Sequence, residues 1–348
     1  MRLHLATIFD SNYLSRGLAL YQSLRNHHTD FVLYIVCLDE KVASYFLQNK
    51  KENIVLIRLK ELEENYPELL LIKEKRSAID YLFTLSPYYP SYILTKFPSI
   101  PFICTLDCDQ FFFNNVEFVF EDLQHYSILI MPHRFSEHIK QLEVWGRYNV
   151  SFQIFKNNKA GIACLKLWQN QCFDWCSDVL DGNRFADQKY LETWEKYFPN
   201  EVKAIDHIGV GVAPWNLSTY KIRKKLGQVL VDDSPLVLFH YQGLRIVHKN
   251  ILQTRFSEYT SNISKSVIAY ILTPIINCLY EYQHPAFTDK IARYANRHSA
   301  RGLLKKVSSP GMLYRAGNTL INLDLIYKFH LKEIKLHGLF NRFKNLYR

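Results

Sequence analysis

The sequence lacks the features of a membrane-spanning or disulfide-stabilised protein. No apolar run approaches the roughly 20 residues that a helix needs to cross a bilayer, and the N-terminus MRLHLATIFD becomes polar too early for a signal peptide. The seven cysteines are odd in number and none are spaced as CxxC, which disfavours a disulfide framework and a zinc site. We therefore expect buried thiols in a reducing compartment and a cytoplasmic protein.

Most of the chain also lacks net charge. The formal charge of the 348 residues is +10, and the stretch 289–348 alone carries this excess, with 13 Lys and Arg against three acidic residues. A neutral body followed by a basic tail indicates two parts. We predict a main domain over residues 1–250 and a basic helical C-terminal region over residues 251–348.

Strand and helix patterns alternate over the first sixty residues. Apolar runs over Leu3–Phe9, Phe31–Leu38 and Ile54–Leu59 predict buried strands. Helical spacing over Tyr13–Arg25 and Val42–Asn49 predicts the helices between them. This β-α-β-α-β order predicts an α/β fold, with a mixed, mostly parallel sheet flanked by helices.

The same reading continues to about residue 250. It predicts helices over Ala78–Phe97, Ala160–Asp178 and Asp187–Tyr197, with Pro87 and Pro90 breaking or kinking the first of them. Further strands are predicted over Pro101–Leu106, Ser127–Met131, Val150–Phe155 and Leu236–Tyr241. From about Asn250 onward the pattern is helical and irregular.

Asp107 and Asp109, in the stretch TLDCDQFFF, are the strongest functional signal. Residues i and i+2 of an extended segment point to the same side, so both carboxylates converge while Cys108 points away. A buried strand delivers the pair to its carboxyl end, where open α/β sheets bind ligands. Two carboxylates there suit Mg²⁺ or Mn²⁺ with substrate phosphates, although a capping pair at a strand-to-loop junction is the structural alternative.

His240 and Arg245, in LVLFHYQGLR, form a second signal. His240 also closes a predicted strand, and a neutral imidazole can join carboxylates around Mn²⁺, although a core histidine is the alternative. Arg245 follows a glycine and can reach a diphosphate with its bidentate guanidinium.

Three further segments are candidates for substrate contact. The segment HIGVGVAPWN combines His207, glycines including Gly211 that allow close backbone approach, and an aromatic turn at Trp215 on which a sugar can stack. The alternative is a glycine-rich connection capped by a core tryptophan. Asp187 and Gln188, in FADQKYLETW, precede a predicted helix, where they can cap the helix or contact a sugar.

Polar residues also follow the first predicted strand. Asp10, Asn12 and Tyr13 lie where a doubly wound sheet begins to bind a nucleotide. Arg76 is an isolated cation available for phosphate or sugar contact, with a solvated surface arginine as the alternative reading.

Taken together, these motifs resemble the nucleotide-diphospho-sugar transferase superfamily with a GT-A fold. The resemblance is to family 8-type glycosyltransferases and related bacterial transferases of lipopolysaccharide and capsule synthesis, and it covers roughly Leu3 to Val247. It rests on motifs found in the family's order: ATIFDSNYLSRGLALYQSL, TLDCDQFFF, YNVSFQIFKN, FADQKYL, HIGVGVAPWN and FHYQGLR.

The resemblance implies an activity and a set of residue roles. It implies transfer of a sugar from a nucleotide-diphosphate donor, UDP-sugars being favoured, to a glycan or glycolipid acceptor, with a divalent metal (Mn²⁺ or Mg²⁺) and retention of the anomeric configuration. By that similarity Thr7, Asp10 and Tyr13 contact the nucleoside, Asp107, Asp109 and His240 hold the metal, and Asn149, Asp187 and Gln188 line the donor-sugar pocket, the last two as catalytic candidates. We also assign Arg76, His207, Gly211, Trp215 and Arg245 to donor binding.

The chain departs from the family pattern at two places. Family 8 proteins commonly end their metal motif in Lys-Pro-Trp, whereas His240 is followed here by Gly243-Leu244-Arg245. Ser151 occupies a position where the family usually has glycine.

The basic tail suggests a location. Leu303–Arg348 interleaves cations with apolar and aromatic residues, as in segments that lie on an anionic leaflet. We therefore hypothesise peripheral docking at the inner face of the membrane, the alternative being helices that pack on the catalytic domain. No nucleic-acid-binding module accompanies the charge, so we expect no nucleic-acid partner.

Three other functions are weighed against this one. A haloacid-dehalogenase-type phosphatase needs Thr two residues after its second Asp, where this chain has Phe111. A sugar nucleotidyltransferase normally has a Gly-rich, basic loop after its first strand, which ATIFDSNYLS lacks. A catalytically silent sugar-nucleotide-binding or scaffold protein stays open on sequence alone.

Overall fold

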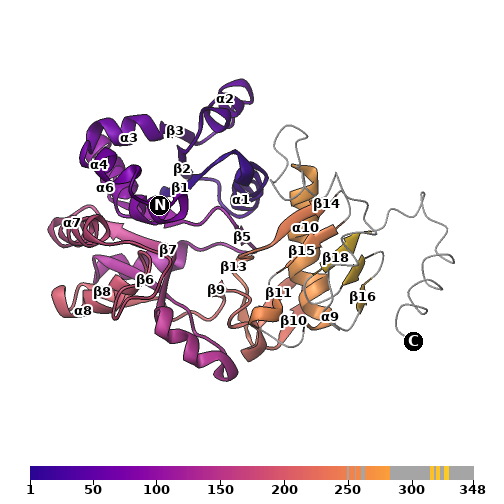
Figure 1. Ribbon diagram of the computed structural model, residues 1–348. Helices are drawn as coiled ribbons and strands as arrows, with labels where there is room; N and C mark the ends of the chain where they lie inside the picture. The colour runs from indigo at the N-terminus through magenta and orange to yellow at the C-terminus, as the bar shows by residue number, and fades with distance from the viewer. Residues whose placement is uncertain are drawn as a thin grey trace.

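A computed structural model gives the fold of this chain (Figure 1). It describes residues 1–248, 251–254, 256–259, 263–282, 314–316, 319–321 and 325–328.

A seven-stranded sheet forms the centre of the N-terminal half. Its order is β3-β2-β1-β4-β7-β6-β8, and β7 alone runs antiparallel to its neighbours. The strands are β1 (Leu3–Phe9), β2 (Phe31–Cys37), β3 (Ile54–Arg58), β4 (Phe102–Leu106), β6 (Ile128–Pro132), β7 (Tyr148–Lys156) and β8 (Val202–Ala204). The continuous apolar runs arise because both faces are covered. The predicted mixed, mostly parallel sheet is thereby confirmed.

Helices cover the two faces of this sheet. The core on one face contains side chains of α1 (Leu14–His27), α2 (Glu40–Gln48) and the 3₁₀ segment η2 (Glu117–Gln124). The core on the other face contains side chains of α3 (Leu59–Asn65), α4 (Glu68–Lys73), α5 (Ala78–Leu85), α6 (Tyr88–Lys96) and α7 (Lys159–Asp174). These layers are visible in Figure 1.

Two predicted helices differ from expectation in detail. The predicted helix Ala78–Phe97 is divided at Pro87 into two helices, α5 and α6. Pro90 lies in the first turn of α6, where a backbone N–H would have no partner within the helix, so proline is tolerated there. The predicted helix Asp187–Tyr197 is a 3₁₀ segment, η4 (Lys189–Thr193), followed by the short α8 (Trp194–Tyr197).

A small three-stranded sheet joins the two halves of the molecule. It has the order β5-β13-β9, made of β5 (Gln110–Phe112), β13 (Leu238–His240) and β9 (Val210–Val212). Phe112 and Leu238 pack into the core of the large sheet, while Phe111 and Phe239 pack into a core shared with the C-terminal helices. In Figure 1, β5 and β13 accordingly lie between the large sheet and the orange C-terminal elements.

The remaining elements are short. A hairpin sheet contains β10 (Ile222–Lys225), β11 (Gln228–Val231) and β12 (Ser234–Pro235). The other 3₁₀ segments are η1 (Ser11–Tyr13), η3 (Glu137–Trp145), η5 (Leu217–Thr219) and η6 (Phe256–Glu258).

The C-terminal region is only partly helical. Helical elements run from α9 (Lys265–Val267) through η7 (Ile268–Leu272) to α10 (Thr273–Glu281), and the Tyr282 hydroxyl donates to Gln22 of α1 at 2.8 Å. A further sheet, of order β14-β15-β18-β17-β16, is made of β14 (Arg245–His248), β15 (Ile251–Gln253), β18 (Leu325–Lys328), β17 (Thr319–Ile321) and β16 (Tyr314–Ala316). The helical prediction therefore misses strands, because the alternating positions are too few for a clear period. Apart from these strands, the tail from residue 283 onward lies outside the described residues.

Two of the expectations from composition can be compared with the fold. All seven cysteines are free and buried, as predicted. Among the described residues, none of the helices is both long and apolar enough to cross a membrane.

Candidate active site

Asp107 and Asp109 occupy the turn that joins β4 to β5. The N–H of Asp107 donates to the Ser151 carbonyl at 3.1 Å, and the carbonyl of Asp109 accepts from the Tyr241 N–H at 3.0 Å. The sequence predicted that the two carboxylates converge through the pleat of an extended strand. In the structure they converge through this turn instead. The backbone is therefore fixed at both ends of the acidic pair, at the carboxyl end of a buried strand.

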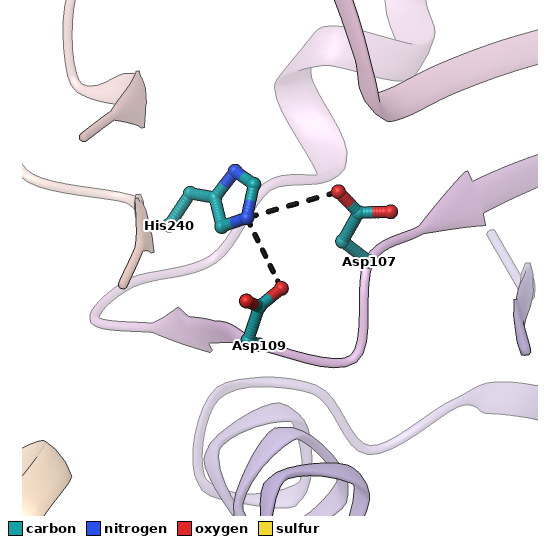
Figure 2. Close-up of side chains that lie close together, drawn as sticks. All are labelled: Asp107, Asp109 and His240. Carbon is teal, nitrogen blue, oxygen red and sulfur yellow. Dashed lines mark hydrogen bonds and ion pairs between the residues drawn. The ribbon is translucent and has the colours of Figure 1, made fainter. Parts of the chain in front are cut away.

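His240 reaches the same point from a distant part of the chain. Strand β13 pairs antiparallel with β5, and the register places His240 opposite Gln110. His240 Nε2 lies 3.1 Å from Asp109 Oδ1 and 3.7 Å from Asp107 Oδ2 (Figure 2). The predicted trio therefore meets in space, with its ligand atoms all within 4.8 Å of one another.

The donor set fits a divalent cation. Two carboxylate oxygens and one imidazole nitrogen suit Mn²⁺ or Mg²⁺, and ligands about 2.1 Å from one ion lie at most about 4.2 Å apart. Small side-chain movements would therefore bring these atoms into coordination distance. The Asp107 side chain is 42% exposed, against 13% for Asp109 and 6% for His240, so the cluster opens toward solvent on the Asp107 side.

The charges of the three groups act on one another. Burial raises the pKa of Asp107 to about 6, with the charge of His240 opposing and that of Asp109 adding to the rise. Burial also acts to raise the pKa of Asp109, but the charge and hydrogen bond of His240 outweigh it, so that this pKa is lowered. For His240, burial lowers the pKa and the two carboxylates more than restore it. Positive charge at this point is stabilising.

Arg16 also contributes to the structure and charge of this site, which we did not predict from the sequence. Its guanidinium donates to the Leu244 carbonyl at 2.8 Å and to the Asn12 carbonyl at 3.2 Å, and its charge helps to lower the pKa of Asp109. It therefore ties the start of α1 to the loop after His240. Arg16 lies inside a helical apolar pattern, and nothing in its local sequence distinguishes it from a surface arginine.

Asp187 is a second buried acid within electrostatic reach of the cluster. Its side chain accepts a hydrogen bond from the Ser86 hydroxyl at 2.5 Å, and the residue is 1% exposed. Burial raises the pKa of Asp187 to about 7, the Ser86 bond opposing and the charge of Asp107 adding to the rise. Asp107 and Asp187 both help to raise the pKa of the buried Tyr89 on α6, which places Tyr89 within reach of both acids.

The backbone around Asp187 is strained and braced. Ala186 has a φ of 46°, a left-handed conformation that is unfavourable for a residue with a Cβ. The Asp187 carbonyl accepts from the Trp168 indole N–H at 2.9 Å. Helix capping is the alternative reading of this segment: Gln188, at the N-cap of η4, makes no side-chain cap, whereas a backbone hydrogen bond from Gln188 helps to lower the pKa of Asp187.

Gln188 and Asn149 bind neighbouring parts of the protein. Gln188 Nε2 donates to the Trp145 carbonyl at 2.9 Å. Asn149, on β7, accepts from the Ser151 N–H at 3.1 Å and from the Ser151 hydroxyl. Because the Ser151 carbonyl in turn accepts from Asp107, Asn149 is connected to the acidic pair through one residue.

The nucleoside candidates follow β1. Thr7 is fully buried, Asp10 accepts from the Asn12 N–H and side-chain amide at 3.0 and 2.6 Å, and the Tyr13 ring lies 4.3 Å from the Arg16 guanidinium. Asp10 therefore caps η1. Contact of these residues with a nucleoside stays a prediction.

Arg76 binds the protein rather than standing free on its surface. Its guanidinium donates to the carbonyls of Cys172 and Phe173 at 2.6 and 2.5 Å and to the Thr84 hydroxyl. It therefore closes the last turn of α7 against α5, a structural role that its sequence did not indicate.

The segment from His207 to Trp215 lies beside the cluster of Asp107, Asp109 and His240. The Trp215 ring is 4% exposed and packs edge to face on His240, 5.2 Å between ring centroids, so it presents no open face for the sugar stacking that we expected. Gly211 has a φ of 80°, and a Cβ there would lie 2.3 Å from Met131 Sδ. His207 Nδ1 accepts from the Gly209 N–H at 3.2 Å.

Arg245 begins β14, where it pairs with Gln253. Its side chain lies outside the described residues, so its contact with a diphosphate stays a prediction.

Comparisons with known proteins find relatives of this chain in sequence. No protein-family model matches the chain. YfnF and YfnD, two uncharacterized proteins of Bacillus subtilis (strain 168), are 31% identical over 252 residues and 29% identical over 247 residues. Each alignment covers 70% of this chain, with 82% of YfnF and 78% of YfnD.

Among solved structures, the galactosyltransferase LgtC in complex with donor and acceptor sugar analogs matches with a TM-score of 0.51. The identity is 14%, over 80% of this chain and 96% of LgtC. At this identity the likeness concerns the fold, which is the GT-A fold of glycosyltransferases.

Proposed function

The chain belongs to the same family as YfnF of Bacillus subtilis and has a GT-A fold, and from this premise we propose that it is a metal-dependent glycosyltransferase. It moves a sugar from a nucleotide-diphosphate donor, a UDP-sugar being favoured, to a glycan or lipid-linked acceptor.

The observation that carries this proposal is the convergence of Asp107, Asp109 and His240. Asp109 and His240 are 131 residues apart in the sequence, yet the ligand atoms of all three residues lie within 4.8 Å of one another at a strand's carboxyl end. A buried structural ion pair would account for Asp109 and His240, but it would not account for Asp107, a second carboxylate that points at the same histidine and is 42% exposed. An incoming cation relieves the repulsion between the carboxylates, which supports a metal and a diphosphate at this site.

Each part of the site has a task in this reaction. Asp107, Asp109 and His240 would hold a divalent metal, which would supply positive charge against the negative charge that develops on the departing nucleoside diphosphate. Arg16 adds positive charge and holds the loop after His240 in place. Asp187 and Gln188 contact the donor sugar, with Ser86 fixing the orientation of the Asp187 carboxylate.

The finer assignments follow the resemblance of the sequence motifs to family 8-type bacterial glycosyltransferases. We propose a hexosyl donor, Mn²⁺ or Mg²⁺ as the ion, retention of anomeric configuration, and an acceptor of lipopolysaccharide or capsule type. The remaining donor contacts are proposed at Thr7, Asp10, Tyr13, Asn149, His207, Gly211 and Arg245, with Arg76 and Trp215 acting by supporting the site.

The decisive experiment measures nucleotide release from a panel of UDP- and GDP-sugars with Mn²⁺, with Mg²⁺ and with a chelator. We expect release with at least one donor, abolished by the chelator and restored by the ion. Metal-independent release, or no release with any donor, contradicts the proposal.

The location is a separate proposal. We propose a cytoplasmic enzyme whose basic tail docks on an anionic leaflet. Truncation after Tyr282 should reduce its sedimentation with anionic vesicles, and unchanged sedimentation contradicts the docking.

A further inference from the structure

An exposed tryptophan lies beside the proposed donor site. Trp168, Trp194 and Trp215 are almost fully buried, whereas Trp145, at the end of η3, is 36% exposed and its neighbour Val144 is 48% exposed. A large aromatic side chain is normally covered, so its exposure indicates a contact surface.

The backbone of Trp145 is bonded to the segment that carries Asp187. Gln188 Nε2 donates to the Trp145 carbonyl at 2.9 Å, and the Arg147 N–H donates to Glu192 of η4 at 2.8 Å. Gly146 makes the connection between these two bonds with a φ of 139°, and a Cβ there would lie 3.2 Å from the Tyr148 carbonyl oxygen. Position 146 therefore favours glycine, and its conformation lets the hydrogen bonds on either side hold the backbone of Trp145 in place.

The ring of Trp145 is held from the same segment. It packs edge to face on Phe185, with 4.8 Å between centroids and an interplanar angle of 63°. Phe185 lies two residues before Asp187. Val144, Trp145 and Phe185, which we call the acceptor platform, are thus continuous with Asp187 and Gln188 through two independent contacts.

We propose that the acceptor platform binds a pyranose ring of the sugar acceptor. The inference rests on the proposed function, because an acceptor must approach the donor sugar where Asp187 and Gln188 hold it. The C–H bonds on one face of a pyranose are weakly positive and pack on the negative face of an indole.

The surroundings of the platform favour a sugar over a lipid chain. Ion pairs lie close by, Lys189 with Glu192 at 3.2 Å and Arg184 with Asp181. These charged groups can bond sugar hydroxyls, whereas a lipid chain lying over them would remove water from both ion pairs without supplying any hydrogen bond in return. A small apolar platform with a charged rim therefore matches one sugar ring.

A binding experiment tests the platform without requiring turnover. The full-length protein with Mg²⁺ and UDP is titrated with the methyl β-glycosides of galactose and glucose and the methyl α-glycoside of mannose. The indole N–H signal of Trp145, assigned with Trp145→Phe, is followed by NMR. We expect a saturable shift with at least one glycoside. No shift with any of them, or an equal shift with hexanol, overturns the proposal.

A kinetic experiment places the platform in the reaction. Trp145→Ala should raise the KM for the responding glycoside about tenfold, as expected for the loss of one stacked ring. Trp145→Tyr should restore most of the affinity, because an aromatic face is kept. Tyr197→Ala removes another exposed aromatic, 55% exposed on α8, and serves as the matched control. An unchanged acceptor KM in Trp145→Ala, or an equal rise in the donor KM, overturns the proposal.

The two experiments separate this inference from the function on which it rests. If the protein releases no nucleotide from any donor, the proposed function fails, and the NMR titration still decides whether the platform binds a pyranose. If nucleotide is released but Trp145 does not respond to glycosides, the platform alone is wrong.

Discussion

Asp109 and Asp187 are both buried acids near one site, but the protein treats their charges in opposite ways. Asp109 has His240 Nε2 at 3.1 Å and Arg16 within electrostatic reach, and its pKa is lowered. Asp187 has the neutral Ser86 hydroxyl, and its pKa is raised to about 7. The comparison teaches that one acid is prepared to stay charged beside a cation, whereas the other is held by a weaker, uncharged partner that a substrate hydroxyl can supplement.

The largest effect is expected from removing Asp109, one of the two carboxylates of the proposed metal site. Asp109→Ala should lower kcat/KM about 1000-fold, because leaving-group charge is no longer neutralised. Calorimetric titration should also show weakened Mn²⁺ binding. Asp233→Asn, whose side chain is 94% exposed in the native protein, is the control. A variant that keeps its metal-dependent turnover would remove Asp109 from the site.

Asp187→Asn should cause a smaller loss of a different kind. We expect kcat to fall about 100-fold through lost positioning, while Mn²⁺ affinity changes little. Calorimetry and steady-state kinetics on the same preparation separate the two effects. Equal losses of metal affinity in both variants would mean that the two acids form one site rather than two.

The raised pKa of Asp187 also predicts a pH dependence of stability. The folded protein retains a proton there that the unfolded chain releases above its ordinary value of 3.8. The contribution of Asp187 to stability is therefore full at low pH and decreases as pH rises toward about 7, by up to about 1.4 kcal/mol per pH unit. Urea unfolding of native protein and Asp187→Asn at pH 5 and pH 7 measures this, and parallel pH responses would contradict it.

The smallest effect is expected at Ser86. Ser86→Ala removes the hydrogen bond that lowers the pKa of Asp187, so kcat should fall about fivefold and the acidic limb of the pH profile should move to higher pH. Ser86→Thr, which keeps the hydroxyl, should restore both. A loss of activity with an unshifted pH profile would indicate a packing role alone.

Much of the large sheet could be predicted from local sequence. Buried parallel strands give continuous apolar runs, and β1 to β4 lie within one or two residues of their predicted ranges. The prediction fails where local signals are short, as in the segment after Asp187, which forms a 3₁₀ turn and a four-residue helix. The strands of the C-terminal region were not predicted for the same reason, because each is too short to give a clear alternating pattern.

The candidate site was predicted unevenly. Asp107 and Asp109 are two residues apart and directly follow a strand, so their closeness could be predicted, although they converge through a turn and not through the strand pleat that we expected. The roles of Arg16 and Ser86 depend on partners 228 and 101 residues away, which no local pattern encodes. Trp215 was expected to offer an open face, but its burial against His240 depends on how three separate segments pack.

The sequence by itself determined the order of the first three strands and the helices between them, the burial of the cysteines, and the delivery of an acidic pair to a strand's carboxyl end. Periodicity and residue type suffice for these features because they reflect local burial. The tertiary structure decided that His240 meets the pair through the register of β13 with β5, that Asp187 stands within reach of Asp107, and that Trp145 is exposed beside Gln188. These depend on pairing between distant segments, whose register is set by the whole packed sheet rather than by any one stretch of residues.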